Sequence, residues 1–233
     1  MATSESPDKS PSSRSEMEQD PWVQPPHMLR FVLDVPNLMT LAGLSSGVLS
    51  IFFAAVGDYS AAMIGLLWSA FFDWFDGPVA KMMKRRPEVF GRFGGQLDSL
   101  SDMVTAGVAP AFILLSVGSY HPLFLPGAIM LILAGAIRLS FFNVYGLRED
   151  GSYSGVPIGI NVILVPLVFL LHGTMSNESF QLALYAVVVL GAVLNVAPIR
   201  FLKLTGGWYV AIAVFVLSMT AFYAWRLSGS TPS

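Results

Sequence analysis

Seven apolar segments constrain the fold of this chain more than any other feature of its sequence. They cover roughly 36–57, 59–83, 97–118, 123–146, 157–173, 179–197 and 208–225. A helix that spans a bilayer needs about 20 mostly apolar residues, and only 12% of this chain is charged, against about 25% in a soluble domain. The sequence therefore predicts an all-α integral membrane protein, a polytopic bundle of six core transmembrane helices with a seventh at the C-terminus.

Composition divides the chain into three regions. Residues 1–27 are rich in Ser, Pro and acidic residues, a composition that buries too little apolar surface to fold, and they lack the basic and apolar regions of a signal peptide. We expect a disordered tail over 1–27, a membrane domain over 28–205, and an additional transmembrane helix with a short tail over 206–233.

Basic residues gather in alternate connections between the apolar segments. They are Lys81, Lys84, Arg85, Arg86 and Arg92 in one connection, Arg148 in another, and Arg200 and Lys203 in a third. Because Lys and Arg are enriched in cytoplasmic loops, this asymmetry predicts an N-terminus inside and a C-terminus outside. It also places the end of the second apolar segment at the cytoplasmic boundary.

Four aspartates stand at that boundary in a chain otherwise poor in charge. Asp73 and Asp76 are three residues apart, and Asp98 and Asp102 are four apart. On helices, both spacings place a pair on one face. Since the intervening loop is short, the two helices should be antiparallel neighbours, and the four carboxylates should converge.

Converging carboxylates require either protonation or a neutralising cation. The chain has no cysteine, so a thiolate metal site is excluded, and oxygen ligands favour hard cations such as Mg²⁺ or Mn²⁺. Two ions bridged by shared carboxylates are the arrangement we expect. The alternative is that the acids form surface ion pairs with Lys81, Lys84 or Arg86.

Small residues flank the acids. Gly77 and Ala80 follow Asp76, and Gly94 precedes Asp98. Small residues permit close approach of a partner helix or of a ligand. Together with Lys81 and the acids, they indicate a cleft for a ligand that carries phosphate, although helix packing alone would also explain them.

The segments "DWFDGPVAK" (73–81) and "GGQLDSLSD" (94–102) resemble the signature of the CDP-alcohol phosphatidyltransferase family, DxxDGxxAR followed by GxxxDxxxD. Lys81 stands where the family has Arg, and the spacer of twelve residues is longer than in most members. "VPNLMTLAGLSSGVLSI" (35–51), "LDSLSDMVTAGVAPA" (97–111) and "RLSFFNV" (138–144) are similar to bacterial phosphatidylserine synthases, and the resemblance covers 35 to about 205.

This resemblance implies transfer of a phosphatidyl group from CDP-diacylglycerol to the hydroxyl of L-serine, giving phosphatidylserine and CMP. The long spacer and the "DGP" of 76–78 look more like bacterial phosphatidylcholine synthases, so choline is the alternative acceptor. Inositol phosphate and glycerol phosphate are further alternatives. The resemblance also implies a homodimer in a bacterial inner membrane, with the active site on the cytoplasmic side and no nucleic-acid partner.

The resemblance assigns roles residue by residue. The metal ligands would be Asp73, Asp76, Asp98 and Asp102, with Asp102 also the general base. The CDP site would comprise Gly77, Ala80, Lys81, Gly94, Asn37 and Thr40. For the acceptor, Arg138 could bind a serine carboxylate, with Asn143 nearby, or Arg138 could simply snorkel to the interface. Choline would instead need an aromatic cage, for which Trp74, Phe75, Phe141 and Phe142 are the candidates.

Two other classes of protein compete with an enzyme. A transporter could bind cations through intramembrane carboxylates, but transporters often carry matching broken helices in repeated halves, and the sequence shows no second DxxDG element after residue 103. A membrane scaffold would leave the acidic cluster unexplained.

Overall fold

The computed structural model describes residues 27–83, 86–202 and 206–229. The predicted disordered tail thus lies, except for His27, outside the described residues. The helices are α2 (Leu29–Val32), α3 (Val35–Ala55), α4 (Tyr59–Met82), α5 (Glu88–Asp102), α6 (Ala109–Val117), α7 (Leu125–Tyr145), α8 (Asn161–Phe169), α9 (Asn177–Val196) and α10 (Trp208–Gly229). A π-helix, η1 (Met103–Val108), joins α5 to α6, and the 3₁₀ turns η2 (Pro122–Phe124) and η3 (Ile158–Ile160) precede α7 and α8.

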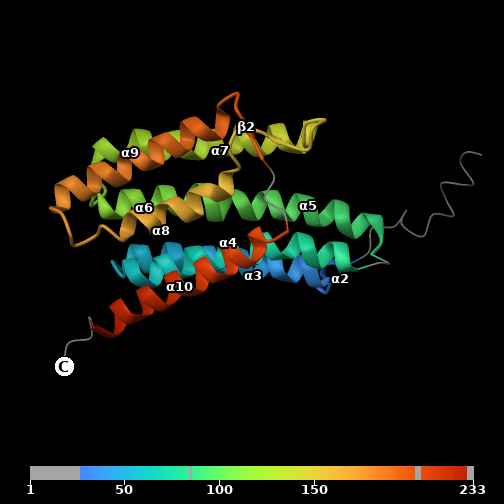
Figure 1. Ribbon diagram of the computed structural model, residues 1–233, viewed down its shortest axis with the longest axis horizontal. Helices are drawn as coiled ribbons and strands as arrows, with labels where there is room; N and C mark the ends of the chain where they lie inside the picture. The colour runs from blue at the N-terminus through green and yellow to red at the C-terminus, as the bar shows by residue number, and fades with distance from the viewer. Residues whose placement is uncertain (1–26, 84–85, 203–205, 230–233) are drawn as a thin grey trace, which may run out of the picture.

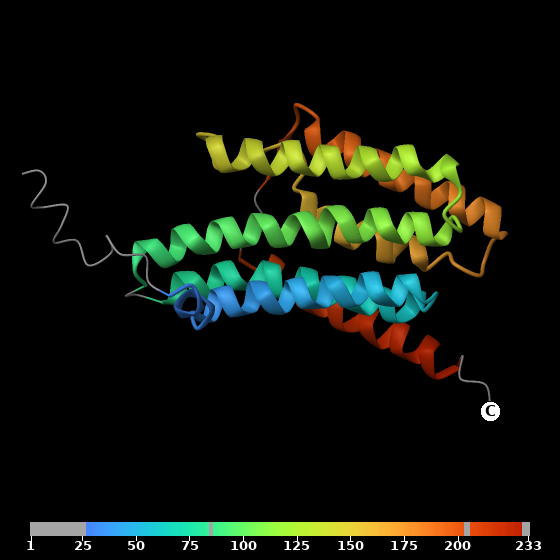
Figure 2. The same cartoon turned by 180° about the vertical axis from the view of Figure 1, so that it is seen from behind.

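The long helices lie side by side in an elongated bundle (Figures 1 and 2). α3 packs along α4, α7 packs along α9, and α10 crosses the outer side of α4. In the described part of the chain, β-structure is limited to the two-residue strands β1 (Tyr153–Ser154) and β2 (Arg200–Phe201). The structure confirms the prediction of an all-α polytopic membrane protein.

Five helical stretches are long and apolar enough to cross a membrane. They are Val35–Ala55, Glu88–Val117, Pro122–Tyr145, Asn177–Val196 and Trp208–Gly229. α4 has 24 residues and carries two aspartates and Lys81, and the apolar helix Ile158–Phe169 is shorter. Each of the seven predicted segments therefore contains a helix. The helices of the second and fifth segments are too charged or too short to be counted among the five.

The third helical stretch begins earlier than its apolar segment predicts. We expected residues 97–118, whereas the helix runs from Glu88 to Val117. Its polar first turns are held by aromatic packing, because the ring of Phe31 lies 4.9 Å from that of Phe90 and 4.5 Å from that of Phe93. The short helix α2 therefore supports the start of α5.

The C-terminal helix is tied to the bundle by polar contacts. The Tyr223 hydroxyl donates to the carbonyl of Pro166 at 2.5 Å, and Arg226 donates to the carbonyl of His172 at 2.7 Å. Val216 and Tyr223 are fully buried. α10 is thus an integral part of the packed structure.

The two strands join the loops that follow α7 and α9. They pair antiparallel, with Tyr153 opposite Phe201 and Ser154 opposite Arg200. A peripheral ion pair, 3.9 Å between Arg200 and Asp150, lies beside them. This small sheet brings Tyr153 and Phe201 to the wall of the cavity described next.

Candidate active site

A cavity of about 360 Å³ opens between the ends of several helices. Its wall comes from α4, α5, α7, the two strands, η3 and α10. Asp73, Asp76, Asp98 and Asp102 all line it, with Gly77 and Lys81 of the predicted set. The cavity therefore gathers both halves of the aspartate pattern.

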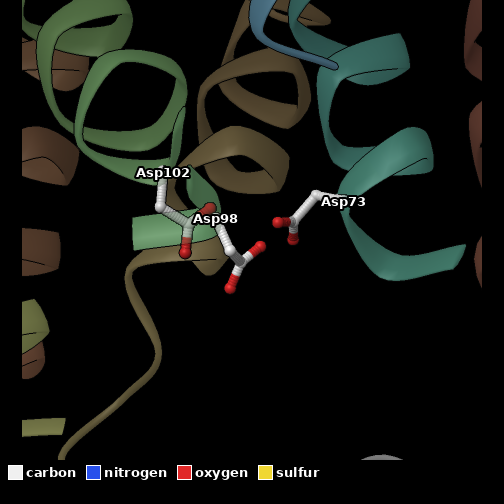
Figure 3. A group of neighbouring side chains, drawn as sticks. All are labelled: Asp73, Asp98 and Asp102. Carbon is white, nitrogen blue, oxygen red and sulfur yellow. The ribbon is translucent and has the colours of Figure 1, made fainter. Parts of the chain in front are cut away.

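Three of the four aspartates form one tight group. Asp73, Asp98 and Asp102 each offer a carboxylate oxygen, and these oxygens lie within 4.8 Å of one another. Figure 3 shows Asp73 reaching from α4 toward Asp98 and Asp102 on α5. The spacing of four residues on α5 places its two carboxylates on one face, as the sequence predicts.

Asp76 lies on the same wall but is engaged differently. Its carboxylate accepts a hydrogen bond of 2.5 Å from the hydroxyl of Thr40, whose side chain is buried in α3. Thr40 itself is absent from the described cavity wall. This bond connects α3 to α4 beside the carboxylate group.

The carboxylate group suits a hard divalent cation. Mg²⁺ and Mn²⁺ prefer oxygen ligands, and bound carboxylates supply both ligand atoms and compensating charge. Within the described residues, no Lys or Arg forms an ion pair with Asp73, Asp98 or Asp102. Of the partners in the ion-pair alternative, Lys84 lies outside the described residues, and Arg86 pairs instead with Asp34. The residues present therefore fit the expected metal.

Gly77 lies on the cavity wall and faces open space. A Cβ built at Gly77 would meet no atom within 4 Å, so helix packing does not require glycine there. Lys81 lines the cavity nearby, whereas Ala80 does not appear on the described wall. A role for these residues in binding CDP remains a prediction.

Asn37 and Gly94 lie in a cluster around Arg86. The Arg86 guanidinium donates to Asp34 at 2.5 Å, to Asn37 Oδ1 at 2.9 Å and to the carbonyl of Phe90 at 3.2 Å. A Cβ at Gly94 would lie 2.6 Å from Asn37 Oδ1 and 3.0 Å from Arg86 Nη2, so a side chain there would displace this cluster. Neither Asn37 nor Gly94 is on the described cavity wall, and their CDP-binding role also remains a prediction.

Arg138 is buried in the cavity wall, with 6% of its surface exposed. Its guanidinium carbon lies 5.4 Å from the ring centre of Phe142 and 5.6 Å from that of Tyr153. Among the described residues, none accepts a hydrogen bond from its Nε. A snorkelling side chain would reach water, whereas this one is buried. Binding of a serine carboxylate by Arg138 remains a prediction.

Asn143 lies one helical turn beyond Arg138 and Leu139. Its Oδ1 accepts a hydrogen bond of 3.0 Å from the hydroxyl of Ser99, and Ser99 lines the cavity one residue after Asp98. Asn143 is itself exposed and absent from the described wall. It is therefore placed to orient Ser99 at the edge of the site.

Several wall residues carried no usable signal in the sequence. They come from the two short strands and the last helix and are Tyr153, Phe201, Tyr209 and Ile212. Burial raises the pKa of Tyr153, while the Arg138 charge acts in the opposite direction, so its phenol stays neutral and can donate a hydrogen bond.

Comparison with known proteins identifies a family and several relatives. A family model described as CDP-alcohol phosphatidyltransferase matches residues 33–197. Archaetidylserine synthase of Methanothermobacter thermautotrophicus is 35% identical over 158 residues, which are 67% of this chain and 66% of that protein. The CDP-diacylglycerol–serine O-phosphatidyltransferase of Helicobacter pylori strain 26695 is 32% identical over 172 residues, 71% of this chain and 70% of that protein.

A phosphatidylcholine synthase is also similar to this chain. Phosphatidylcholine synthase of Brucella melitensis is 27% identical over 196 residues, which are 83% of this chain and 66% of that protein. The chain thus spans about two thirds of the length of these relatives. α10 lies beyond the region that the family model matches.

Proposed function

Because the chain belongs to the CDP-alcohol phosphatidyltransferase family, we propose that it transfers the phosphatidyl group of CDP-diacylglycerol to the hydroxyl of L-serine and releases CMP. The observation that carries this proposal is the arrangement of one cavity. It holds the carboxylates of Asp73, Asp98 and Asp102 and a buried arginine, Arg138.

The proposed metal ligands are Asp73, Asp76, Asp98 and Asp102. A bound pair of Mg²⁺ or Mn²⁺ ions would neutralise the pyrophosphate and stabilise the charge on departing CMP. The chain's own part is to hold its carboxylates close together, with Thr40 restraining Asp76. Such restraint reduces the reorganisation that the site needs when the donor lipid binds.

Asp102 is the proposed general base. Its carboxylate takes the proton of the serine hydroxyl as that oxygen bonds to the phosphorus of the phosphatidyl group. The bond from this phosphorus to the oxygen of CMP breaks, and its electron pair leaves with CMP. Lys81, on the cavity wall, contributes positive charge toward the phosphates, although it lacks the planar fork of arginine.

Arg138 supports serine as the acceptor. Serine brings a carboxylate, and an arginine fork is well suited to bind one. Choline would need free aromatic faces, but the guanidinium already lies over the rings of Phe142 and Tyr153. Of the other candidate cage residues, Trp74 lines the cavity, whereas Phe75 packs against Phe71 at 4.6 Å.

The proposed setting is the cytoplasmic side of a bacterial inner membrane. The enzyme would draw CDP-diacylglycerol from the bilayer and serine from the cytoplasm, and it would work as a homodimer. The loop asymmetry of Lys and Arg supports this orientation. Reading the accessibility of single cysteines, introduced into the naturally cysteine-free chain, would test it.

A panel of acceptors tests the proposal. Purified protein receives CDP-diacylglycerol and Mn²⁺, and CMP release is followed with serine, choline, inositol phosphate and glycerol 3-phosphate in parallel. Release with serine, accompanied by phosphatidylserine, is the expected result. Release with choline alone would replace the proposed acceptor, and release with none would contradict phosphatidyl transfer to these alcohols.

A further inference from the structure

The helix that carries Asp98 and Asp102 changes its winding directly after Asp102. The π-helix η1 occupies Met103–Val108, and the backbone N–H of Ala109 bonds to the carbonyl of Val104, five residues earlier. A residue of an α-helix turns the chain by about 100°. The one extra residue of a π-turn therefore determines the direction in which Asp98 and Asp102 point around the helix axis, relative to the side chains of α6.

Pro110 explains why the helix is perturbed at this place. In a regular α-helix, the N–H of residue 110 would donate to the carbonyl of Ala106. Proline has no N–H, and its ring also crowds that carbonyl. Ala106 is fully buried, so its carbonyl needs another donor if the cost of a buried unpaired group is to be avoided.

Asn161 supplies a donor from another helix. Its Nδ2 donates to the carbonyl of Ala106 at 3.2 Å, and the side chain has only 3% of its surface exposed. A Cβ on Gly191 of α9 would lie 2.5 Å from Asn161 Oδ1, so glycine there makes room for the amide. The first residue of α8 is thus fixed between the π-helix and α9.

The π-helix is also packed closely against α3. A Cβ on Gly47 of α3 would lie 2.6 Å from Cγ2 of Thr105. The contacts from α3 and from Asn161 leave little space for the π-turn to move along the helix. A shift toward the N-terminus, past Asp102, would rotate this carboxylate by about 100° away from Asp73.

We propose that Asn161 is a positioning residue: by donating to the Ala106 carbonyl that Pro110 leaves without its usual donor, it fixes the π-helix and so the direction in which Asp98 and Asp102 face Asp73. The inference rests on the proposed role of these aspartates as metal ligands. Asn161 itself is absent from the cavity wall and acts only through the helix that carries them.

The test compares Asn161→Leu with Asn195→Leu. Asn195 is also fully buried, and among the described residues its side-chain atoms have no hydrogen-bond partner, so it controls for replacing a buried amide. We expect Asn161→Leu to lower turnover by about 10-fold to 100-fold, the range for a small misplacement of reacting groups. It should also raise the Mn²⁺ concentration needed for half-maximal CMP release and weaken Mn²⁺ binding measured by electron paramagnetic resonance.

A second comparison introduces Asn161→Leu into a Pro110→Ala variant. The Pro110→Ala change restores the N–H at residue 110, so Asn161→Leu should cost a smaller fold-change in Pro110→Ala than in the wild type. Equal fold-changes in the two backgrounds would overturn the link between Pro110 and Asn161. Wild-type turnover and Mn²⁺ binding in Asn161→Leu, or losses equal to those of Asn195→Leu, would overturn the positioning role.

Gly191→Ala keeps the test decisive if Asn161→Leu does not fold. This change retains the amide but places a methyl group against Asn161 Oδ1, and the same increase in Mn²⁺ requirement is expected. Unchanged Mn²⁺ dependence would overturn the proposal. If instead the wild-type protein neither binds Mn²⁺ nor releases CMP, the proposed function fails before Asn161 is tested.

Discussion

The hydroxyl of Thr40 donates a hydrogen bond of 2.5 Å to the carboxylate of Asp76. Thr40 lies on α3 and Asp76 on α4, so one side-chain contact joins the first long helix to the aspartate pattern. The carboxylate group of Asp73, Asp98 and Asp102 stands beside it. The position of Asp76 is therefore restrained before any ligand binds.

Thr40→Val tests this restraint. Valine keeps the shape of the side chain but removes the donor, and a hydrogen bond to a charged group contributes about 1.5–3 kcal/mol. We expect CMP release to fall by about 10-fold or more and the Mn²⁺ requirement to rise. Ser45→Ala is the matched control, because the Ser45 hydroxyl is exposed and donates to the carbonyl of Leu41 within α3. Equal effects of the two changes would contradict the restraint.

Asp102→Asn tests the general base. The amide keeps the size of the side chain but cannot accept the serine proton, so turnover should fall by about 10²-fold to 10⁴-fold while the protein still folds. Glu88→Gln is the control: it also replaces an acid by an amide on the same helix, but at an exposed position. It should leave turnover unchanged. Near-wild-type turnover in Asp102→Asn would remove this role from Asp102.

Arg138→Gln tests the acceptor site. Losing a charged donor to the serine carboxylate should raise the KM for serine by about 10-fold or more, with the KM for CDP-diacylglycerol within about 2-fold. Arg148→Gln, at an exposed loop position, is the control and should change neither constant. If both KM values rise equally in Arg138→Gln, the proposal that Arg138 contacts the acceptor specifically is wrong.

Arg86 and Asp34 form a buried ion pair whose loss should affect stability. Their side chains are 13% and 5% exposed, and removing one partner from a buried pair costs about 3–5 kcal/mol because the other charge remains buried. We expect Arg86→Met to lower the thermal unfolding midpoint more than the double change Asp34→Asn with Arg86→Met. A double variant less stable than Arg86→Met would contradict this explanation.

Local sequence patterns were sufficient to predict the helices and the spacing of acidic residues along them. The apolar segments indicated the helices, and the spacing of Asp98 and Asp102 predicted their shared face. The pairing of Asp34 with Arg86 was not predicted, because it joins residues 52 positions apart and no local pattern encodes it. From sequence alone, Arg86 is instead a candidate partner of the four aspartates.

The rest of the site depends on long-range packing. Tyr153 and Phe201 reach the cavity only because two distant loops pair as strands, and Tyr209 reaches it because α10 packs on α4. The π-helix could not be predicted from Pro110 alone. Proline can also kink or end a helix, and here the contact from Asn161 accompanies the π-turn.

The most direct test of metal-dependent phosphatidyl transfer is product stoichiometry in protein treated with a chelator and then dialysed. CDP-diacylglycerol and serine are added, and CMP and phosphatidylserine are measured while Mn²⁺ or Mg²⁺ is titrated. We predict no turnover without metal and equal amounts of the two products once metal is restored. Turnover that persists without metal, or CMP released without phosphatidylserine, would contradict the account.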